Sequence, residues 1–484
     1  MLLSVGVVSS AVERRFHTAE VSGSRPLRPT ILRLETAWRQ EALCQAVPPD
    51  RTTAWGGCFH ADTHVVSKII LNTHAARPMT VLFFCVLVAF LGWWGLLLWP
   101  AEAWRYREHF AASLQNKSGM EDVGDVTVVV PARNEEAVIE RTLAALHAQG
   151  ANLHVVVLDD QSTDATLERI HASGVRGLTI RQGKPLPPGW VGKLWALEQG
   201  VSEVSTPWIL LLDADIELAP GVLPALRAKA ESENWSAVSI MAAPHLETRA
   251  ERCFLTAFVY FFKLLYPFSR VRRPRCSTAA AAGGCVLLRR DALAALGGFA
   301  PMRSALIDDC TLARRLKEHG YRIWLGTSRE VRSLRAQDTR SVARMVMRTA
   351  YTQLHCSPLL LALTTLMMVV FFAVPWVGLL VGDGTVRIMS VLALIAMMVS
   401  YLPTLRYYRQ PLWRVIFLPP VALIYLCWTW GSALRDVRGV RSEWKGRRYL
   451  QENFGESLEP TVATPDRPET GSYNDRSHKQ NGGQ

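Results

Sequence analysis

The stretch "ILLLDADIELAP", residues 209–220, has the pattern of an apolar strand that ends in acidic residues. Its four leading apolar residues are typical of a buried strand, and Asp213 and Asp215 follow where that strand ends. Alternate residues of a strand point to opposite faces, so a turn at this point is needed for both carboxylates to address one cation. Mg²⁺ prefers such oxygen ligands, together with the phosphates of a substrate. Chance or a surface turn would explain a lone pair, but the place of this pair after a buried strand favours a metal site.

Short apolar runs alternate with helical stretches across residues 124–335, which is typical of βαβ units and a parallel sheet. Three expected strands end in polar clusters, "PARNEE", "DDQSTD" and "DADIE". Ligands bind at the carboxyl ends of the strands in such sheets, so the three clusters predict one ligand site. Glu135 and Glu136 are expected in the first turn of a helix, where the helix dipole favours acids. The expected strands are residues 126–131, 153–160, 178–180 and 208–215, and the main expected helices are residues 135–149 and 192–203.

Two further polar groups in this part of the chain favour a nucleotide. Asp160 follows a strand, where a carboxylate can accept from a base N–H or a ribose hydroxyl, whereas Asp164 suits a structural role at the next helix. Lys193 stands at a loop-to-helix junction, and both a helix N-terminus and a lysine favour phosphate. Taken alone, Lys193 is weak evidence because exposed lysines are common.

A second carboxylate pair, Asp308 and Asp309, precedes an amphipathic helix whose apolar face is Leu312, Ala313 and Leu316. Aspartates cap helices well, so this pair could serve the fold alone. A carboxylate within hydrogen-bond reach of a hydroxyl can equally remove its proton as a general base. The spacing by itself leaves both roles open.

The composition places the 484-residue chain between soluble enzymes and membrane bundles, because 49% of its residues are hydrophobic and its mean hydropathy is +0.10. A soluble domain joined to membrane helices fits best. The net charge of +12 suits nucleic acid or an anionic membrane surface, and the apolar segments favour the membrane over nucleic acid. Nine cysteines without CxxC spacing indicate reduced thiols, and hence an enzymatic domain that faces the cytosol.

Four apolar segments are candidates for crossing a membrane. The first carries no charge, is long enough to span a bilayer, and ends in tryptophans that arginines follow. The four segments are residues 80–99, 359–381, 388–405 and 415–434.

The last apolar segment, 415–434, conflicts with the positive-inside rule. A single crossing there would place the basic loop 405–414 and the basic stretch 435–449 on opposite sides of the membrane. The segment also contains two prolines, so it could be re-entrant or lie in the interface. We therefore expect two to three spanning helices within 359–434.

The two ends of the chain read differently from its middle. Residues 1–78 show no sustained periodicity and lack the basic start of a signal peptide, and Met79 stands directly before the first apolar segment. We predict a poorly ordered extension there, and we hypothesise a mis-called start, with the working protein beginning at Met79. Residues 435–484 are predicted to form a tail that is first basic and then disordered.

The aromatic and apolar stretch 251–275 ends in an arginine cluster. This pattern is typical of an interfacial helix beside anionic headgroups, and it would suit a lipid substrate. A plain core helix is the alternative.

The polar clusters together resemble family 2 glycosyltransferases of GT-A fold, which are inverting nucleotide-sugar transferases. The matching motifs are "VVVPARNEE", "LDDQSTD", the "GK" of "WVGKLWAL", "DAD" and the "DD" before "LARRL", in this order over residues 124–350. The segments "PLPPGWVGKLWAL", "AAAAGGCVLLRRDALAALGGF" and "EWKGRRY" are similar to the hopene-associated subgroup. The resemblance implies a Rossmann-like nucleotide-sugar-binding domain flanked by transmembrane helices.

The resemblance also implies a role for each matching residue. Asp309 would be the catalytic base, with Asp308 where the family usually has Glu. Asp213 and Asp215 would hold Mg²⁺ or Mn²⁺ and, through it, the donor diphosphate. Residues implied in binding the nucleotide-sugar are Pro131, Ala132, Arg133, Glu135, Asp160, Lys193, Asp213, Gly283 and Gly284.

The resemblance implies a single transfer rather than polymer synthesis. Processive members carry a QxxRW motif, where this chain has Met345 for the Gln and Thr349 for the Trp. The predicted protein is a multi-pass enzyme of the inner membrane with its catalytic domain in the cytosol. It would move a sugar, with a UDP-sugar as the expected donor, to a membrane lipid of hopanoid type.

Two other functions compete with this prediction. Another metal-dependent transferase that uses nucleotides, such as a nucleotidylyltransferase, usually has a Gly-rich loop after the first strand, which "PARNEEA" lacks. A non-catalytic membrane scaffold or transporter is disfavoured by the intact carboxylates and by apolar segments without internal ionisable residues.

Overall fold

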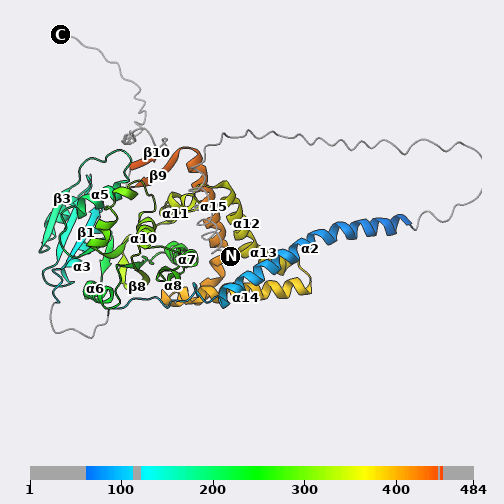
Figure 1. Ribbon diagram of the computed structural model, residues 1–484. Coiled ribbons are helices and arrows are strands. Elements are labelled where there is room, and N and C mark those ends of the chain that lie inside the picture. Colours follow the sequence, from blue (N-terminus) through cyan, green and yellow to red (C-terminus); the bar gives the residue numbers. More distant parts are fainter. Residues whose placement is uncertain (1–61, 113–120, 445–446, 451–484) are drawn as a thin grey trace, which may run out of the picture.

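The computed structural model describes residues 62–112, 121–444 and 447–450, with side chains described in 79–112 and 121–439. An α/β domain lies beside a group of long helices (Figure 1). The predictions of a poorly ordered start and of a disordered tail fall mainly on residues 1–61 and 451–484, outside the described residues.

One eight-stranded sheet forms the centre of the domain, in the order β3-β2-β1-β4-β7-β6-β8-β5. The sheet is mixed, because β7 runs antiparallel to β4 and β6, and β5 runs antiparallel to β8. The strands that the sequence predicts, β1 to β4, pair in parallel as expected, whereas β5 and β7 were not predicted. The strands are β1 (Val126–Ala132), β2 (His154–Asp159), β3 (Leu178–Gln182), β4 (Trp208–Leu212), β5 (Ile216–Leu218), β6 (Ala237–Ala243), β7 (Cys285–Arg289) and β8 (Ile323–Ser333).

Alternation along the strands divides the core into two layers. In β1, Val128 and Val130 pack on one face of the sheet, and Val129 packs on the other. The first face is covered by α3 (Ile139–His147), α4 (Thr166–Ala172) and α6 (Val222–Ser232). The second face is covered by α5 (Gly192–Val201), α9 (Arg290–Ala295) and α10 (Asp308–Glu318). Both faces are apolar, so nearly every residue of the central strands is buried.

The ends of the elements differ from the sequence prediction where polar side chains hold the backbone. Helix α3 begins at Ile139, so the prediction of Glu135 and Glu136 in its first turn is wrong. The backbone N–H of Glu135 instead donates to the Thr166 hydroxyl at 2.7 Å. Asp164 accepts from the backbone N–H of Thr166 at 3.0 Å, in agreement with its predicted structural role.

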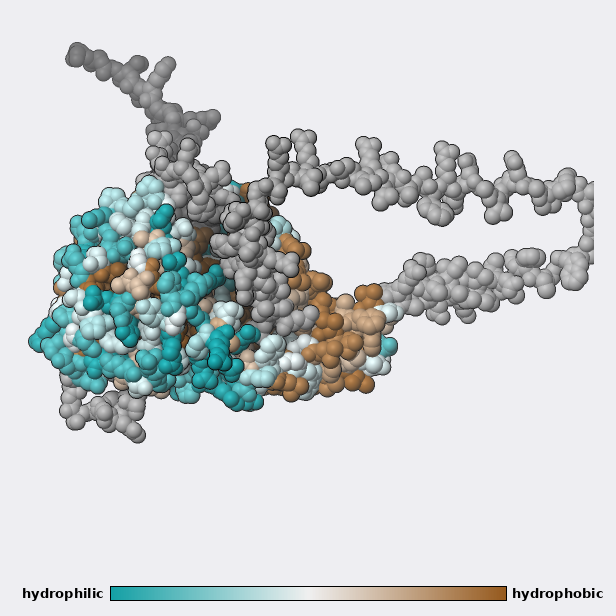
Figure 2. Space-filling view, in the orientation of Figure 1, coloured by the Kyte–Doolittle hydropathy of each residue, from teal (hydrophilic) through white to brown (hydrophobic). Residues whose placement is uncertain are grey.

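Within the described residues, four helical segments are long and apolar enough to cross a membrane: Met79–Leu98, Pro358–Val381, Gly384–Tyr407 and Leu412–Val437. Figure 2 shows their hydrophobic surface on the side away from the hydrophilic α/β domain. The predicted class, an α/β domain flanked by candidate transmembrane helices, is confirmed. The segments comprise α2 (Asp62–Leu98), α12 (Pro358–Met368), the π-helical η2 (Val369–Ala373), α13 (Val374–Val381), α14 (Gly384–Tyr407), η3 (Leu412–Phe417) and α15 (Leu418–Val437).

Helices α7 (Arg249–Leu265) and α11 (Thr339–Gln353) join the domain to these segments. Thr248 and Glu251 form a capping box that begins α7. The buried Tyr260 hydroxyl lies 2.7 Å from the Ser400 hydroxyl of α14. The stretch 251–275 therefore packs partly as a core helix and partly against the apolar segments. The short α8 (Phe268–Val271), η1 (Ala300–Met302) and the hairpin β9 (Val440–Trp444) and β10 (Arg447–Leu450) complete the described elements.

Helix α15 has a different direction from the other apolar helices. It runs crosswise to α2 and α14, at the boundary between the α/β domain and the apolar helices (Figure 1). Its Tyr425 hydroxyl donates to the Phe254 carbonyl of α7 at 3.0 Å, and its Ser432 hydroxyl accepts from the Tyr351 N–H of α11 at 3.1 Å. Helix α15 thus follows the membrane-facing side of the domain along its length.

Candidate active site at the strand ends

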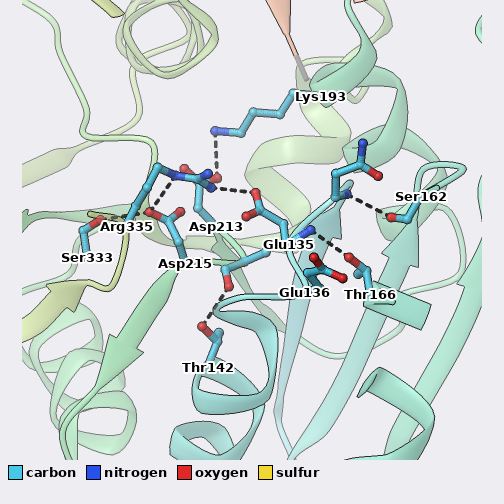
Figure 3. A network of polar contacts seen from close by, with 12 residues as sticks. Glu135, Glu136, Thr142, Ser162, Thr166, Lys193, Asp213, Asp215, Ser333 and Arg335 are labelled. Atoms are coloured by element: carbon cyan, nitrogen blue, oxygen red, sulfur yellow. Dashed lines mark hydrogen bonds and ion pairs between the residues drawn. The ribbon is translucent and has the colours of Figure 1, made fainter. Parts of the chain in front are cut away.

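Lys193 joins the two carboxylate pairs that the sequence singles out. Its ammonium lies 2.8 Å from Asp213 Oδ1 and 3.2 Å from Asp308 Oδ2. Burial disfavours a charged lysine, but the carboxylates of Asp213 and Asp308 outweigh it and raise the pKa of Lys193. The lysine therefore stays protonated and offsets their charge. Figure 3 shows it pointing at Asp213 from the start of α5.

Asp309 is held by backbone donors beside this lysine. Its Oδ2 accepts from the Gly283 N–H at 2.9 Å, and its Oδ1 accepts from the Cys310 N–H at 2.7 Å. Burial, and then the negative charge of Asp308, raise the pKa of Asp309 to about 6. A carboxylate oriented in this way and poised near neutral pH has the properties of a general base.

Asp215 belongs to a second group of side chains next to Asp213. Its Oδ2 accepts from the Ser333 hydroxyl at 2.9 Å and lies 3.4 Å from Arg335 Nε. Arg335 also pairs with Glu135 at 2.6 Å, so one guanidinium joins the ends of β1, β4 and β8 (Figure 3). Sequence reasoning did not find Ser333 or Arg335, because no motif follows β8. The one sequence signal that could have identified Arg335 is its charge, just after the strand 323–333.

Arg133 and Asp160 connect the ends of β1 and β2. The Arg133 guanidinium donates to the backbone carbonyls of Asp160 and Gln161, and the Asp160 N–H donates to the Ala132 carbonyl at 2.8 Å. Asp160 is fully buried, so a contact between its carboxylate and a nucleotide base would require the adjoining loop to move. In the described structure, Arg133 and Asp160 hold the ends of β1 and β2 together, and we call this part the rim of the site.

Gly283 and Gly284 let the backbone approach the carboxylates closely. A Cβ at Gly283 would lie 3.2 Å from Asp309 Cβ and 3.3 Å from the Lys193 ammonium. At Gly284 it would lie 3.2 Å from Ile216 Cδ1, and the Gly284 carbonyl accepts from the Asp213 N–H at 3.0 Å. A side chain at Gly283 would therefore press on Asp309 and Lys193, and one at Gly284 would press on Ile216.

The space among these groups is small. Pro131, Lys193, Asp213, Gly283 and Asp309 border a cavity of about 20 Å³, which holds about one water molecule. The predicted residues thus fall into three neighbouring groups. Lys193, Asp213, Asp308, Asp309, Gly283 and Pro131 share the cavity; Asp215 and Glu135 share Arg335; and Ala132, Arg133 and Asp160 form the rim.

The donor set fits a hard divalent cation. Asp213 and Asp215 offer carboxylate oxygens, and Mg²⁺ commonly takes one or two carboxylates plus substrate phosphates. Among the described residues no group of three or more His, Cys, Asp or Glu side chains could hold a metal ion, so water and substrate oxygens would complete the coordination. Burial raises the pKa of Asp213, and a cation at this point would favour its ionised form.

The end of α7 connects the site to an apolar cavity. Leu264 borders a cavity of about 390 Å³, whose other walls come from α2, α12 and η2 and include Trp93, Met368 and Phe371. Two residues further on, the Tyr266 side chain lies close to that of Cys310, next to Asp309. The carboxylate site and the apolar cavity therefore adjoin the same helix end.

Residues 124–352 match the model of the family described as glycosyltransferase-like family 2. The chain is 29% identical over 113 residues to a 4,4'-diaponeurosporenoate glycosyltransferase of Staphylococcus haemolyticus (strain JCSC1435), which is 23% of this chain and 30% of the relative. It is 33% identical over 115 residues to an undecaprenyl-phosphate 4-deoxy-4-formamido-L-arabinose transferase of Shewanella sediminis (strain HAW-EB3), which is 23% of this chain and 34% of the relative. The matches thus span about a third of these curated relatives.

Among solved structures, the chain is similar to a mannosyltransferase from Pyrobaculum calidifontis in complex with GDP-Man and Mn²⁺. The match has a TM-score of 0.44 and 20% identity, and it covers 74% of this chain and 99% of that one. The family match covers all eight strands of the sheet and every carboxylate of the site. The similarity to the glycosyltransferase-like family 2 model therefore lies in residues 124–352, which form the α/β domain, and candidate membrane helices flank these residues.

Proposed function

We propose that this protein is a membrane-bound inverting glycosyltransferase that moves one sugar from a nucleotide-sugar donor to a membrane lipid. The observation that carries the proposal is the Lys193 ammonium, which lies within 3.2 Å of both Asp213 and Asp308. It brings the "DAD" and "DD" motifs into one site within the family 2 domain. The proposed donor is a UDP-sugar.

In the proposed reaction, Asp309 removes the proton from an acceptor hydroxyl. The freed oxygen attacks the anomeric carbon on the face opposite the nucleotide, the bond to the diphosphate breaks, and the configuration inverts. General-base help of this kind typically gives roughly 10²–10⁴-fold in rate. Lys193, which stays protonated, compensates charge on the departing diphosphate. Mg²⁺ or Mn²⁺ held by Asp213 and Asp215 would supply further charge compensation when bound.

Several features support an apolar lipid as the acceptor. The cavity of about 390 Å³ is lined by aliphatic and aromatic side chains and adjoins α7, whose end reaches Cys310 beside Asp309. The relatives' names contain a diaponeurosporenoate and an undecaprenyl phosphate. Within this class we propose a hopanoid-type lipid, as the resemblance of "PLPPGWVGKLWAL" to the hopene-associated subgroup implies.

We also propose that the enzyme transfers a single sugar, and that it lies in the inner membrane with its active site facing the cytosol. Met345, which replaces the Gln of the processive motif, packs among the apolar helices, and the Thr349 hydroxyl contacts the Met345 carbonyl at 3.5 Å. The thiols of the described residues are free, which suits a reducing compartment.

The test is release of UDP by the purified, detergent-solubilised protein. UDP-sugars are offered with Mn²⁺ or Mg²⁺, with and without a hopanoid-containing lipid extract. Asp309→Asn is run in parallel, and Asp291→Asn is the matched control, because Asp291 pairs with Arg289 on the far side of the sheet from the strand ends.

We expect metal-dependent release that the extract increases, that Asp309→Asn abolishes, and that Asp291→Asn preserves. Equal release by wild type and Asp309→Asn would remove the base assignment. Release without any effect of lipid would remove the proposed acceptor class.

A further inference from the structure

A second cavity, of about 540 Å³, lies between the β5–β8 edge of the sheet and the end of α14. Four arginines line it: Arg141, Arg329, Arg332 and Arg409. It adjoins the candidate active site, because Ser333, which holds Asp215, also lines it. Nothing in the proposed transfer uses this cavity.

Three glutamates, Glu217, Glu247 and Glu330, also line the cavity, so its arginines exceed its carboxylates by one. Arg141 is paired with Glu217 at 3.2 Å, and the Glu330 carboxylate accepts from the Ala112 N–H at 2.6 Å. Within the part of the chain that the structure describes, Arg329, Arg332 and Arg409 form no ion pair with a carboxylate. Arg332 donates to the Arg329 carbonyl at 2.9 Å, which brings the two neighbouring arginines together. These three guanidinium groups are exposed and are therefore available to an anionic ligand.

Arg409 occupies a backbone conformation that arginine rarely adopts. Its φ is +52°, in the left-handed region where glycine and asparagine are common. The residue ends α14 at the rim of the cavity and its side chain is exposed. A glycine would meet the need of the turn, so the presence of a guanidinium here points to a role for the side chain.

The cavity also lies where a candidate membrane helix reaches the domain. Tyr408 and Arg409 follow the apolar segment Gly384–Tyr407 directly. The Arg329 guanidinium lies 5.6 Å from the Tyr407 ring centroid, and Tyr407 stacks on Tyr106, which comes just after α2. Residues that follow two candidate spans therefore meet beside the cavity, and a membrane crossed by both helices would place lipid headgroups near it.

We propose that this cavity binds the phosphate group of an anionic membrane lipid. A guanidinium is suited to phosphate because it is permanently charged and can donate two parallel hydrogen bonds. The volume exceeds that of a single phosphate ion, so it accommodates a headgroup with its polar substituents. This site is separate from the site for the sugar donor, and the proposal does not depend on the transfer reaction.

The experiment measures lipid binding by the full-length protein in neutral detergent, by native mass spectrometry. Phosphatidic acid is the probe, and phosphatidylcholine with the same chains is its zwitterionic counterpart. The site variant is Arg329→Gln with Arg409→Gln. The control variant, Arg176→Gln with Arg290→Gln, removes the same charge from exposed positions on the sheet domain. A parallel titration adds inorganic phosphate as competitor.

We expect phosphatidic acid to bind at least tenfold more weakly to the site variant than to wild type, with little change in the control variant or for phosphatidylcholine. Equal affinity of the site variant and wild type would overturn the proposal. An equal loss in both variants would do the same, since binding would then follow net charge alone. Displacement by equimolar inorganic phosphate would reject a membrane lipid in favour of a free phosphate. Thermal unfolding of each variant checks that it is folded.

Discussion

At the scale of single residues, Asp309 makes the pH dependence of transfer predictable. Its pKa of about 6 means that the base is protonated below pH 6, so kcat/KM should fall as pH decreases through 6. Part of that raised pKa comes from Asp308, and Asp308→Asn should therefore move the acid limb to lower pH. A pH–rate profile of both proteins measures this. An unchanged limb in Asp308→Asn would contradict the electrostatic account.

The same raised pKa has a consequence for stability. The folded state binds the Asp309 proton more tightly than the unfolded chain, whose value is near 3.8. Ionised Asp309 therefore opposes folding above pH 6, and this penalty disappears as pH falls toward 4. Asp309→Asn should remove this pH-dependent contribution, which thermal unfolding across that range would reveal.

Lys193 is the cation on which the carboxylates depend. Lys193→Met should lower the free energy of unfolding by about 1–3 kcal/mol, because it leaves Asp213 and Asp308 without their partner. Lys184→Met, an exposed lysine in the preceding loop, is the matched control and should have little effect. Thermal or denaturant unfolding gives the comparison. If both variants unfold like wild type, Lys193 does not hold the site together.

At the scale of elements, Arg335 links the ends of β1, β4 and β8 through ion pairs with Glu135 and Asp215. Arg335→Gln should destabilise the domain by about 1–3 kcal/mol, because it removes the ion pair between Arg335 and the buried Glu135 carboxylate. The double variant Arg335→Gln with Glu135→Gln should recover part of the loss. A double-mutant cycle in unfolding free energy measures the coupling, and additive losses would show that the pair does not act as a unit.

The contact between α2 and η2 is close enough that Gly92 leaves no space for a side chain. A Cβ at Gly92 would lie 2.1 Å from Phe371 Cε1, whereas one at Gly95 would meet nothing within 4 Å. Gly92→Ala should therefore displace the Phe371 ring and cost about 1–3 kcal/mol, and Gly95→Ala should be tolerated. The melting temperatures of the two variants in detergent decide the matter. Similar values for both would mean that the two helices separate easily.

Much of the fold could be predicted from the sequence, because burial of an apolar run such as "ILLL" is favourable whichever elements pack on it. The strand ends with Asp213 and Asp160 were found for the same reason. The antiparallel direction of β7 could not be predicted, since it depends on where α7 and α8 deliver the chain. Arg335 was missed because it matters only through its contacts with Asp215 and Glu135, which are distant in sequence.

At the scale of the whole molecule, the direction of α15 suggests a topology that the sequence left open. It packs on α7 and α11 of the domain side and crosses the direction of α2 and α14. We expect it to lie in the membrane interface, with the loop at 408–411 and the hairpin β9–β10 on one side. Both basic stretches then obey the positive-inside rule.

Reporter fusions test this arrangement. A fluorescent protein that folds in the cytosol should be bright when fused after Gln484 or inserted after Arg409, and an alkaline phosphatase at either place should be inactive. A fusion inserted after Gly382, between α13 and α14, is the control and should show the reverse. Opposite results at Gln484 and Arg409 would establish α15 as a crossing helix.

The end of α7 has one more consequence. Leu264 borders the apolar cavity, and Tyr266, which follows α7, lies close to Cys310, the neighbour of Asp309. Under the proposed function, this helix end would set the distance between the hydrocarbon part of an acceptor and the atom that receives the sugar. Under the proposed function, the protein would choose its acceptor by measuring how far a hydroxyl stands from the hydrocarbon, and lipids with very different skeletons could satisfy the same measurement.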